Sequence, residues 1–241
     1  MSAKEVAGMR LSYGQEKETF VEDDLISKEP YANFEHWFNE ACETPDVLEP
    51  NGMALATSAL DGKPSIRMVL LKGFSKKGFT FYTNYSSRKG KQLEQNPHAA
   101  LCFYWCNFTS EKKRWARQVR IEGKVQKVSE EEAKDYFHSR PRLSQIGACV
   151  SNQSSVIAGR QVLVEKQKQL EENYSDESVP VPKPESWGGY LLIPDMVEFW
   201  QGQTNRLHDR IVFRRPSANE EIDSELTHPG EDGWVYERLS P

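Results

Sequence analysis

Hydrophobic residues recur along this chain with two different periods. Four residues that fall at i, i+3, i+4 and i+7 carry the first period: Phe34, Trp37, Phe38 and Ala41. This spacing places them on one face, so it predicts an amphipathic helix that Pro30 opens and that packs on a barrel of strands. After residue 52 the apolar runs become short and are separated by turn residues such as Asp61 and Gly62, which is typical of strands joined by tight turns.

These patterns divide the chain into a series of expected elements. Strands are expected at residues 53–59, 65–72, 78–83, 99–105, 118–127, 189–193, 197–202, 209–213 and 234–238, with the first three forming a meander. Helices are expected from a cap at Ser86 or Ser87 to about residue 96, at residues 129–138 with Ser129 as the cap, and at residues 160–173, and a loop is expected at residues 175–186. The polar residues 1–28 predict a mobile N-terminal arm, and residues 29–241 predict a single domain. The expected fold class is α+β, with mainly antiparallel strands and peripheral helices.

Composition and charge argue against several classes of protein. The formal net charge of −5 disfavours a nucleic-acid partner, which would need a basic surface. No apolar run is long enough to cross a bilayer, so no membrane partner is expected. Residues 1–10 lack the apolar region of a secretion signal, and a cytoplasmic location is therefore expected. The four cysteines contain no C-x-x-C pair and no metal-like spacing with histidines, so they predict free thiols and no metal site.

An alternating group of cations follows an aromatic run near the C-terminus. If Arg206, His208 and Arg210 lie on a strand, they point to one face, while Leu207 and Asp209 point to the other. A cationic face with one imidazole suits a planar anionic ligand whose reaction needs a group that titrates near neutral pH. The alternative is a solvated strand edge that carries charges.

Three further groups of residues suit anions. Ser87-Arg88-Lys89 lies at a predicted helix N-terminus, where unpaired N–H groups favour an anion, although a solvated basic turn is the alternative. Tyr136, Arg140 and Ser144 offer one guanidinium and two hydroxyls, which suit a phosphate dianion. Their spacing alone indicates little, because Pro141 makes a continuous helix doubtful. The segment 67–72 has a cation at each end of an apolar middle, and the alternative there is simply a buried strand with charged ends.

Several motifs together resemble the pyridoxine/pyridoxamine 5'-phosphate oxidases, a family of flavoproteins. They appear in the order of that family and cover nearly the whole chain: Arg10 and Tyr13, Arg67–Lys72, Phe81–Asn84, Ser87–Lys89, Tyr136–Pro141, Ser144–Gly147, Gln153–Ser155, Trp187–Gly189 and Glu198–Arg210. The resemblance implies an FMN-binding split β-barrel and a homodimer with the flavin at the subunit interface. It also implies that pyridoxine 5'-phosphate and pyridoxamine 5'-phosphate are converted to pyridoxal 5'-phosphate, with O2 as acceptor, H2O2 as product and ammonia released from the amine.

The resemblance further implies the residues that bind each ligand. The positions that match the family's FMN contacts are Arg67, Met68, Val69, Leu70, Leu71, Lys72, Tyr82, Thr83, Arg88, Lys89, Gln118, Gln153, Ser154, Trp200 and Arg210. The positions that match its substrate contacts are Arg10, Tyr13, Lys72, Tyr136, Arg140, Ser144, Arg206, Leu207 and His208. Among these, Arg206 and His208 are expected to face the pyridine ring as the catalytic pair, and Lys72, Tyr136, Arg140 and Ser144 to hold the substrate phosphate.

The chain departs from the family pattern in one loop, and two other functions are alternatives. Residues 106–117 are longer than the family's usual connection, and we expect an extended hairpin loop there, with a partner patch at its basic tetrad as a weaker alternative. A non-catalytic flavin or pyridoxal-phosphate binding module would lack the Arg206 and His208 pair. A split-barrel reductase with another flavin-like cofactor would lack the Tyr136, Arg140 and Ser144 set.

Overall fold

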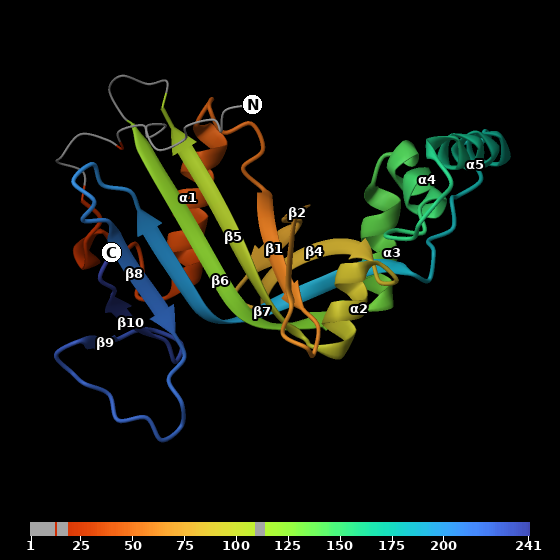
Figure 1. Cartoon of the computed structure of the whole chain (residues 1–241). Coiled ribbons are helices and arrows are strands. Elements are labelled where there is room, and N and C mark those ends of the chain that lie inside the picture. Colours follow the sequence, from red (N-terminus) through yellow and green to blue (C-terminus); the bar gives the residue numbers. More distant parts are fainter. Residues whose placement is uncertain (1–12, 14–18, 109–113) are drawn as a thin grey trace, which may run out of the picture. The chain divides into compact units, whose positions relative to one another are not determined.

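The computed structural model describes residues 13, 19–108 and 114–241 (Figure 1). Its helices are η1 (Glu22–Asp24), α1 (Pro30–Glu43), α2 (Arg88–Gln95), α3 (Glu130–Ser139), α4 (Arg142–Val150) and α5 (Arg160–Asn173). Its strands are β1 (Gly52–Ser58), β2 (Pro64–Leu70), β3 (Gly73–Ser75), β4 (Gly78–Asn84), β5 (His98–Asn107), β6 (Trp115–Lys127), β7 (Trp187–Gln201), β8 (Asp209–Arg214), β9 (Thr227–Pro229) and β10 (Val235–Arg238). In these ranges the strand order is β2-β1-β5-β6-β7-β8-β10-β9, and β4 pairs with β3 and β7.

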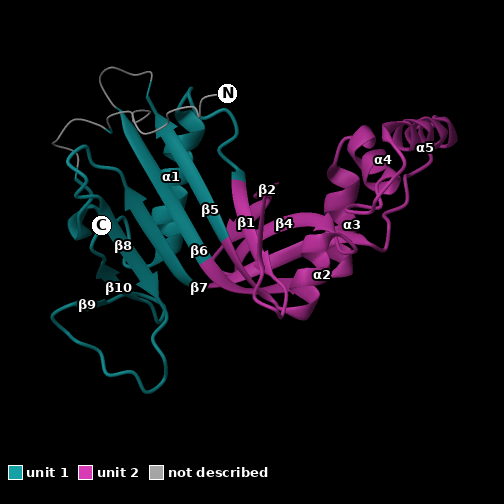
Figure 2. Ribbon diagram, in the orientation of Figure 1, with its two compact units in different colours: residues 1–52, 101–121, 195–241 teal, residues 53–100, 122–194 magenta. Residues whose placement is uncertain are grey.

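Two compact units divide the chain (Figure 2). Unit 1 comprises residues 1–52, 101–121 and 195–241, and unit 2 comprises residues 53–100 and 122–194. The strands β5, β6 and β7 each contribute residues to both units.

In unit 1, the predicted amphipathic helix is confirmed as α1. The carboxylate of Glu29 caps its first turn by accepting two backbone hydrogen bonds. The buried face of α1 packs against the sheet, where Phe34 contacts Phe103 of β5 and Trp37 contacts Phe199 of β7, each at 5.2 Å between ring centroids. On the C-terminal half of β7, β8 pairs antiparallel, and β10 pairs with β8 in the same way.

In unit 2, the strand β4 pairs antiparallel with the N-terminal half of β7, so that Phe81 lies opposite Tyr190. The predicted cap of the following helix is confirmed, because the Ser87 hydroxyl accepts a hydrogen bond from the backbone of Gly90 at 3.3 Å. The helices α3 and α4 and the start of β7 enclose a small apolar core: Phe137, Ile146, Val150, Val181 and Trp187. This core holds the helices on which several expected site residues lie.

The expected meander of the first three predicted strands is wrong. The strands β1 and β2 are neighbours, but the third strand, β4, pairs with β3 and β7. The short strand β3 was not predicted, and it uses the residues between β2 and β4 to form a local hairpin. Turn residues indicate where a strand ends, but they do not indicate which strand it pairs with. The partner of β4 is β7, which comes from a distant part of the chain.

The strand β7 is continuous where two strands were expected. Pro194, which has no N–H to donate, lies between those two expected strands. However, the register with β4 ends at Leu192 and the register with β8 begins at Met196, so Pro194 lies between the two pairings and the strand passes through it. The sequence pattern also missed the helix α4 and the strand β9.

The expected hairpin loop at residues 106–117 is shorter than predicted, because strand residues occupy both of its ends. The strand β5 extends to Asn107 and β6 begins at Trp115, because this hairpin continues its pairing beyond the predicted ends. Residues 109–113 lie outside the described residues, and they include Lys112 and Lys113 of the basic tetrad at residues 112–115.

Candidate active site

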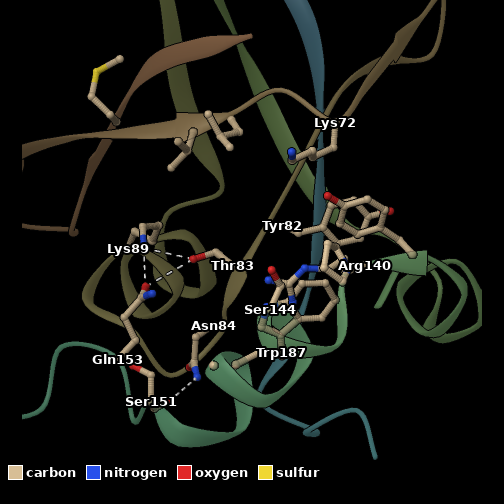
Figure 3. Close-up of a pocket in the computed structure, with 17 residues that line it drawn as sticks. Lys72, Tyr82, Thr83, Asn84, Lys89, Arg140, Ser144, Ser151, Gln153 and Trp187 are labelled. Atoms are coloured by element: carbon tan, nitrogen blue, oxygen red, sulfur yellow. Dashed lines mark hydrogen bonds between the residues drawn. The ribbon is translucent and has the colours of Figure 1, made fainter. Parts of the chain in front are cut away.

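Unit 2 contains a cavity of about 620 Å³, lined by residues of β2, β4, α2, α3, α4 and β7 (Figure 3). Its lining carries three cationic side chains, those of Lys72, Lys89 and Arg140. Within the part of the chain that the structure describes, no carboxylate lines this cavity. Like charges in one hollow repel each other, so the cavity favours an anionic ligand.

One end of the cavity is formed around Lys89 in the first turn of α2. Its ammonium group donates hydrogen bonds to the Thr83 hydroxyl at 3.0 Å and to the Gln153 side-chain oxygen at 2.5 Å (Figure 3). Burial, and then the positive charge of Arg67, lower the pKa of Lys89 to about 8. A solvated basic turn does not produce such a shift, whereas an anion next to this group would reverse it.

Two arginines add positive charge near Lys89. The guanidinium of Arg67 donates to the carbonyl of Leu55 at 3.0 Å, and burial followed by the charge of Arg88 lowers its pKa. The backbone N–H of Arg88 donates to the hydroxyl of Ser154 at 3.2 Å, and Ser154 adopts the left-handed conformation, with φ of 72°. Among the described residues, no carboxylate forms a salt bridge with these two arginines or with Lys89.

The other end of the cavity brings together four predicted residues: Lys72, Tyr136, Arg140 and Ser144. The prediction that Pro141 interrupts the helix is confirmed, because α3 ends at Ser139 and α4 begins at Arg142. The chain therefore bends between Tyr136 and Ser144, and both still face the same hollow. The atom Nη1 of Arg140 is buried and has no hydrogen-bond partner among the described residues. A buried unpaired donor is costly, so this group points to a ligand.

A stack of aromatic rings holds this end of the cavity. The rings of Tyr82 and Tyr136 stack at 3.9 Å between centroids, and Tyr82 stacks on Trp187 at 5.4 Å. The guanidinium of Arg140 lies over the indole of Trp187 at 4.8 Å. A side chain at Gly189 would meet the Tyr82 ring at 2.7 Å, so this position must be small. Trp187 was not among the predicted site residues, although the motif that begins with it was the signal.

The strand β2 supplies the apolar wall of the cavity. Met68, Val69 and Leu70 line it, and Leu71 is buried beside it. The alternative of a buried strand with charged ends is wrong for most of this segment, because the side chains of β2 alternate between exposed and half-buried positions and Met68 is 69% exposed. This strand lies at one end of the strand order and has β1 as its neighbour.

The strand expected at residues 209–213 is confirmed as β8, but the alternation of Arg206, His208 and Arg210 on one strand face is not observed. The strand β8 begins at Asp209, and the residues before it form a turn in which Arg206 has φ of 70°. The backbone N–H of Arg206 donates to the carbonyl of Gln203 at 3.2 Å and closes this turn. Strand alternation therefore does not set the directions of Arg206 and His208. Arg206 and Leu207 are both exposed.

The imidazole of His208 has a defined hydrogen-bond partner in this turn. The backbone N–H of Gln203 donates to its Nδ1 at 2.9 Å, so the neutral ring carries its proton on Nε2. The His208 ring lies 4.9 Å from Trp200 and 6.0 Å from Tyr13 between ring centroids. Three predicted ligand contacts thus form one aromatic cluster in unit 1.

Arg210 is held by a buried carboxylate. Glu198, which is 2% exposed, accepts hydrogen bonds from Arg210 Nε at 2.8 Å and from Arg120 Nη2 at 2.5 Å. Burial opposes the ionisation of Glu198, but the hydrogen bonds from both arginines outweigh it, and its pKa lies below the usual value. Neither Glu198 nor Arg120 was predicted as a site residue, because nothing in local spacing links residues on β6, β7 and β8.

The predicted site residues are distributed over both units. Unit 1 contains Tyr13, Gln118, Trp200, Arg206, Leu207, His208 and Arg210, and unit 2 contains the remaining described positions. Gln118 is half-buried on β6. Arg10 lies outside the described residues.

Comparison with known proteins identifies the chain. Residues 40–174 match the family model of pyridoxamine 5'-phosphate oxidase. The chain is 54% identical to the pyridoxine/pyridoxamine 5'-phosphate oxidase of Bombyx mori, over 98% of this chain and 90% of that protein. It is also 54% identical to the pyridoxine-5'-phosphate oxidase of Bos taurus, over 100% of this chain and 89% of that protein. This chain belongs to the pyridoxine/pyridoxamine 5'-phosphate oxidase family.

Two further matches bear on the architecture of this family member. Residues 187–241 match the pyridoxine 5'-phosphate oxidase C-terminal dimerisation region, which supports the expected homodimer. The crystal structure of PhzG from Burkholderia lata 383, in complex with tetrahydrophenazine-1-carboxylic acid, superposes with a TM-score of 0.76 at 27% identity, over 93% of this chain and 98% of that chain. The family and the split-barrel fold inferred from the sequence motifs are therefore confirmed.

The cysteines, possible metal ligands and helix lengths of this chain also bear on the expectations from the sequence. All four cysteines are free. In the described ranges, no group of three or more histidine, cysteine or acidic residues is arranged to hold a metal ion. No helix in that same part of the chain has the length and apolar character needed to span a membrane.

Proposed function

We propose that this chain is an FMN-dependent oxidase that converts pyridoxine 5'-phosphate and pyridoxamine 5'-phosphate to pyridoxal 5'-phosphate. The observation that carries the proposal is a single cavity with Lys72, Lys89 and Arg140 in its lining and no carboxylate among its described lining residues. The cations lie at two separate ends, which suits two phosphorylated ligands, the cofactor and the substrate. Family membership supplies the reaction type.

The donor set around Lys89 fits the phosphate of FMN. A dianion would accept hydrogen bonds from Lys89 Nζ and the Thr83 hydroxyl, and Arg67 and Arg88 would add charge. The apolar stretch of β2 suits the edge of a flat ring system. When bound, FMN supplies the two-electron acceptor of the reaction, and O2 regenerates it with release of H2O2.

At the other end, Lys72, Arg140, Tyr136 and Ser144 would hold the substrate phosphate. The unpaired Arg140 Nη1 gains a partner when the phosphate is present. This contact lies away from the reacting carbon, so its binding energy can be used to orient the pyridine ring. The phosphorylated form should therefore be the true substrate.

In unit 1, Arg206 and His208 would act on the substrate ring. The neutral His208 presents the proton on Nε2, because Nδ1 already accepts from Gln203, so it donates a hydrogen bond to the oxygen or nitrogen on C4'. The guanidinium of Arg206 can stack on an aromatic plane, which an ammonium cannot do. Arg206→Lys should therefore lower kcat/KM without loss of bound flavin.

The test is the absorption spectrum of the purified protein. It should be yellow and run as a dimer, lose its flavin absorption when pyridoxine 5'-phosphate is added without oxygen, and recover it in air with formation of pyridoxal 5'-phosphate and H2O2. A colourless protein that stays inactive after FMN is added would refute the proposal. Binding of both ligands without loss of flavin absorption would favour a non-catalytic module.

A further inference from the structure

The carboxylate of Asp209 joins three separate segments of unit 1. Asp209 is the first residue of β8 and is 7% exposed. Its Oδ2 accepts hydrogen bonds from the backbone N–H of Phe20 at 3.0 Å and from the side-chain amide of Gln203 at 2.7 Å. Its Oδ1 accepts from Arg238 of β10 at 3.1 Å. The two bonds to Oδ2 are buried and therefore costly to break, and the bond from Arg238 is partly buried.

Gln203 is the residue through which this junction reaches His208. Its side chain is tied to Asp209, while its backbone N–H donates to Nδ1 of His208 and its carbonyl accepts from the backbone of Arg206. Gln203 is itself 7% exposed, so its amide has little freedom once it is bound. One buried glutamine thus contacts both residues of the proposed catalytic pair.

The turn between Gln203 and His208 needs contacts that hold its backbone conformation. Arg206 adopts a left-handed conformation that a non-glycine residue takes only when the surrounding structure holds it there. The hydroxyl of Thr204 also donates a hydrogen bond to the carbonyl of Tyr13, whose ring lies against His208. The geometry of the turn therefore depends on contacts made on both sides of Gln203.

We propose that Gln203, anchored by Asp209, is a positioning residue that sets the tautomer and orientation of His208 and the conformation of Arg206. An N–H that points at Nδ1 excludes a proton from that atom, so the neutral ring keeps its proton on Nε2. Loss of the anchor frees the turn, and both tautomers of His208 then become accessible. The proposal rests on the proposed function for the kinetic part only, because the tautomer is a property of the protein alone.

The first experiment observes the tautomer directly. Protein labelled with ¹⁵N in its histidine rings is examined by long-range ¹H–¹⁵N NMR, and the His208 signals are assigned with His208→Gln. In the wild type, Nε2 should be the protonated nitrogen and Nδ1 the unprotonated one. In Gln203→Ala the two forms should exchange. The same single tautomer in wild type and variant, or a proton on Nδ1 in the wild type, would overturn the proposal.

The second experiment measures turnover with a matched control. Gln203→Ala should lower kcat on the order of 10- to 100-fold, with KM and FMN content little changed, because ring orientation and not phosphate binding is affected. Gln201→Ala is the control, since Gln201 is also buried, at 6% exposed, but accepts its hydrogen bond from Arg117. An equal fall of kcat in both variants would mean a merely structural role and would refute positioning.

A second variant covers the case in which Gln203→Ala does not fold. Gln203→Met keeps the length of the side chain but has no amide, so the hydrogen bond to Asp209 Oδ2 cannot form while the bonds from Phe20 and Arg238 remain. It should reproduce the loss of kcat and the tautomer exchange, and unchanged values of both would contradict the proposal. An inactive wild type with the expected single tautomer would instead refute the proposed function and leave the inference on His208 intact.

Discussion

The pH dependence of FMN binding provides a sharp test of the cation cluster around Lys89. In the ligand-free protein, burial and then the charge of Arg67 lower the pKa of Lys89 to about 8. A phosphate dianion next to Nζ favours the protonated form, so binding above this pH requires uptake of a proton. The affinity should therefore be complete well below pH 8 and should fall as the pH rises through that value.

The size of the effect follows from the proton equilibrium of Lys89. The protonated fraction falls from roughly nine-tenths at pH 7 to roughly one-tenth at pH 9 when the pKa is about 8. The Kd for FMN should consequently rise about tenfold over this interval, which corresponds to about 1.4 kcal/mol. The phosphate of FMN is already a dianion throughout this range, since its second pKa is about 6.

The assay is quenching of flavin fluorescence as apoprotein is added at each pH. Lys89→Arg keeps its charge across the range, so its Kd should not change with pH, and Lys89→Met should bind more weakly at pH 7 with no slope. Riboflavin, which has no phosphate, is the control ligand and should also show no slope. A wild-type Kd that is independent of pH, or a slope that persists in Lys89→Met, would refute the argument.

Three further predictions concern single side chains. Arg140→Ala should lower kcat/KM for pyridoxine 5'-phosphate by about 10- to 150-fold, with FMN content intact, and steady-state assays should show that it loses most of the preference over unphosphorylated pyridoxine. Trp187→Leu removes the plane under Arg140 and should raise KM for the phosphate ester by about 2- to 30-fold, whereas Trp187→Phe should recover part of this loss; equal KM in both variants would exclude the cation–π contact. Glu198→Gln removes the buried negative charge that accepts from both Arg120 and Arg210, so denaturant unfolding should show a loss of about 1–3 kcal/mol, and an unchanged midpoint would contradict this.

Local features of the fold were predictable from the sequence. The N-caps at Ser87 and Ser129, the helical period from Phe34 to Ala41 and the interruption at Pro141 all act within a few residues, and the structure has each of them. The pairing of β4 with β7 was not predictable, because it depends on residues far apart in the chain.

The candidate site was likewise predictable from the sequence only in part. The approach of Arg140 to Lys72 in one cavity came from the family resemblance, since their spacing alone carries no such information. The turn at Arg206 could not be predicted from alternation, because the side chain of Gln203 holds it by a hydrogen bond to Asp209, and Asp209 in turn is bound by Phe20 from a distant part of the chain. Trp187 was visible only as part of a motif, since its role depends on which rings stack on it.

The uncompensated charge in the cavity has a consequence for the amount of folded protein. The chain folds with Lys72, Lys89 and Arg140 in one hollow, and no carboxylate among its described lining residues offsets their mutual repulsion. Each anion that occupies the hollow therefore stabilises the folded state over the unfolded one, by a free energy that grows with ligand concentration. In the proposed function FMN is one of these anions, so the supply of flavin would govern how much of this chain survives unfolding and degradation, and a shortage of the vitamin would lower the amount of protein as well as its activity.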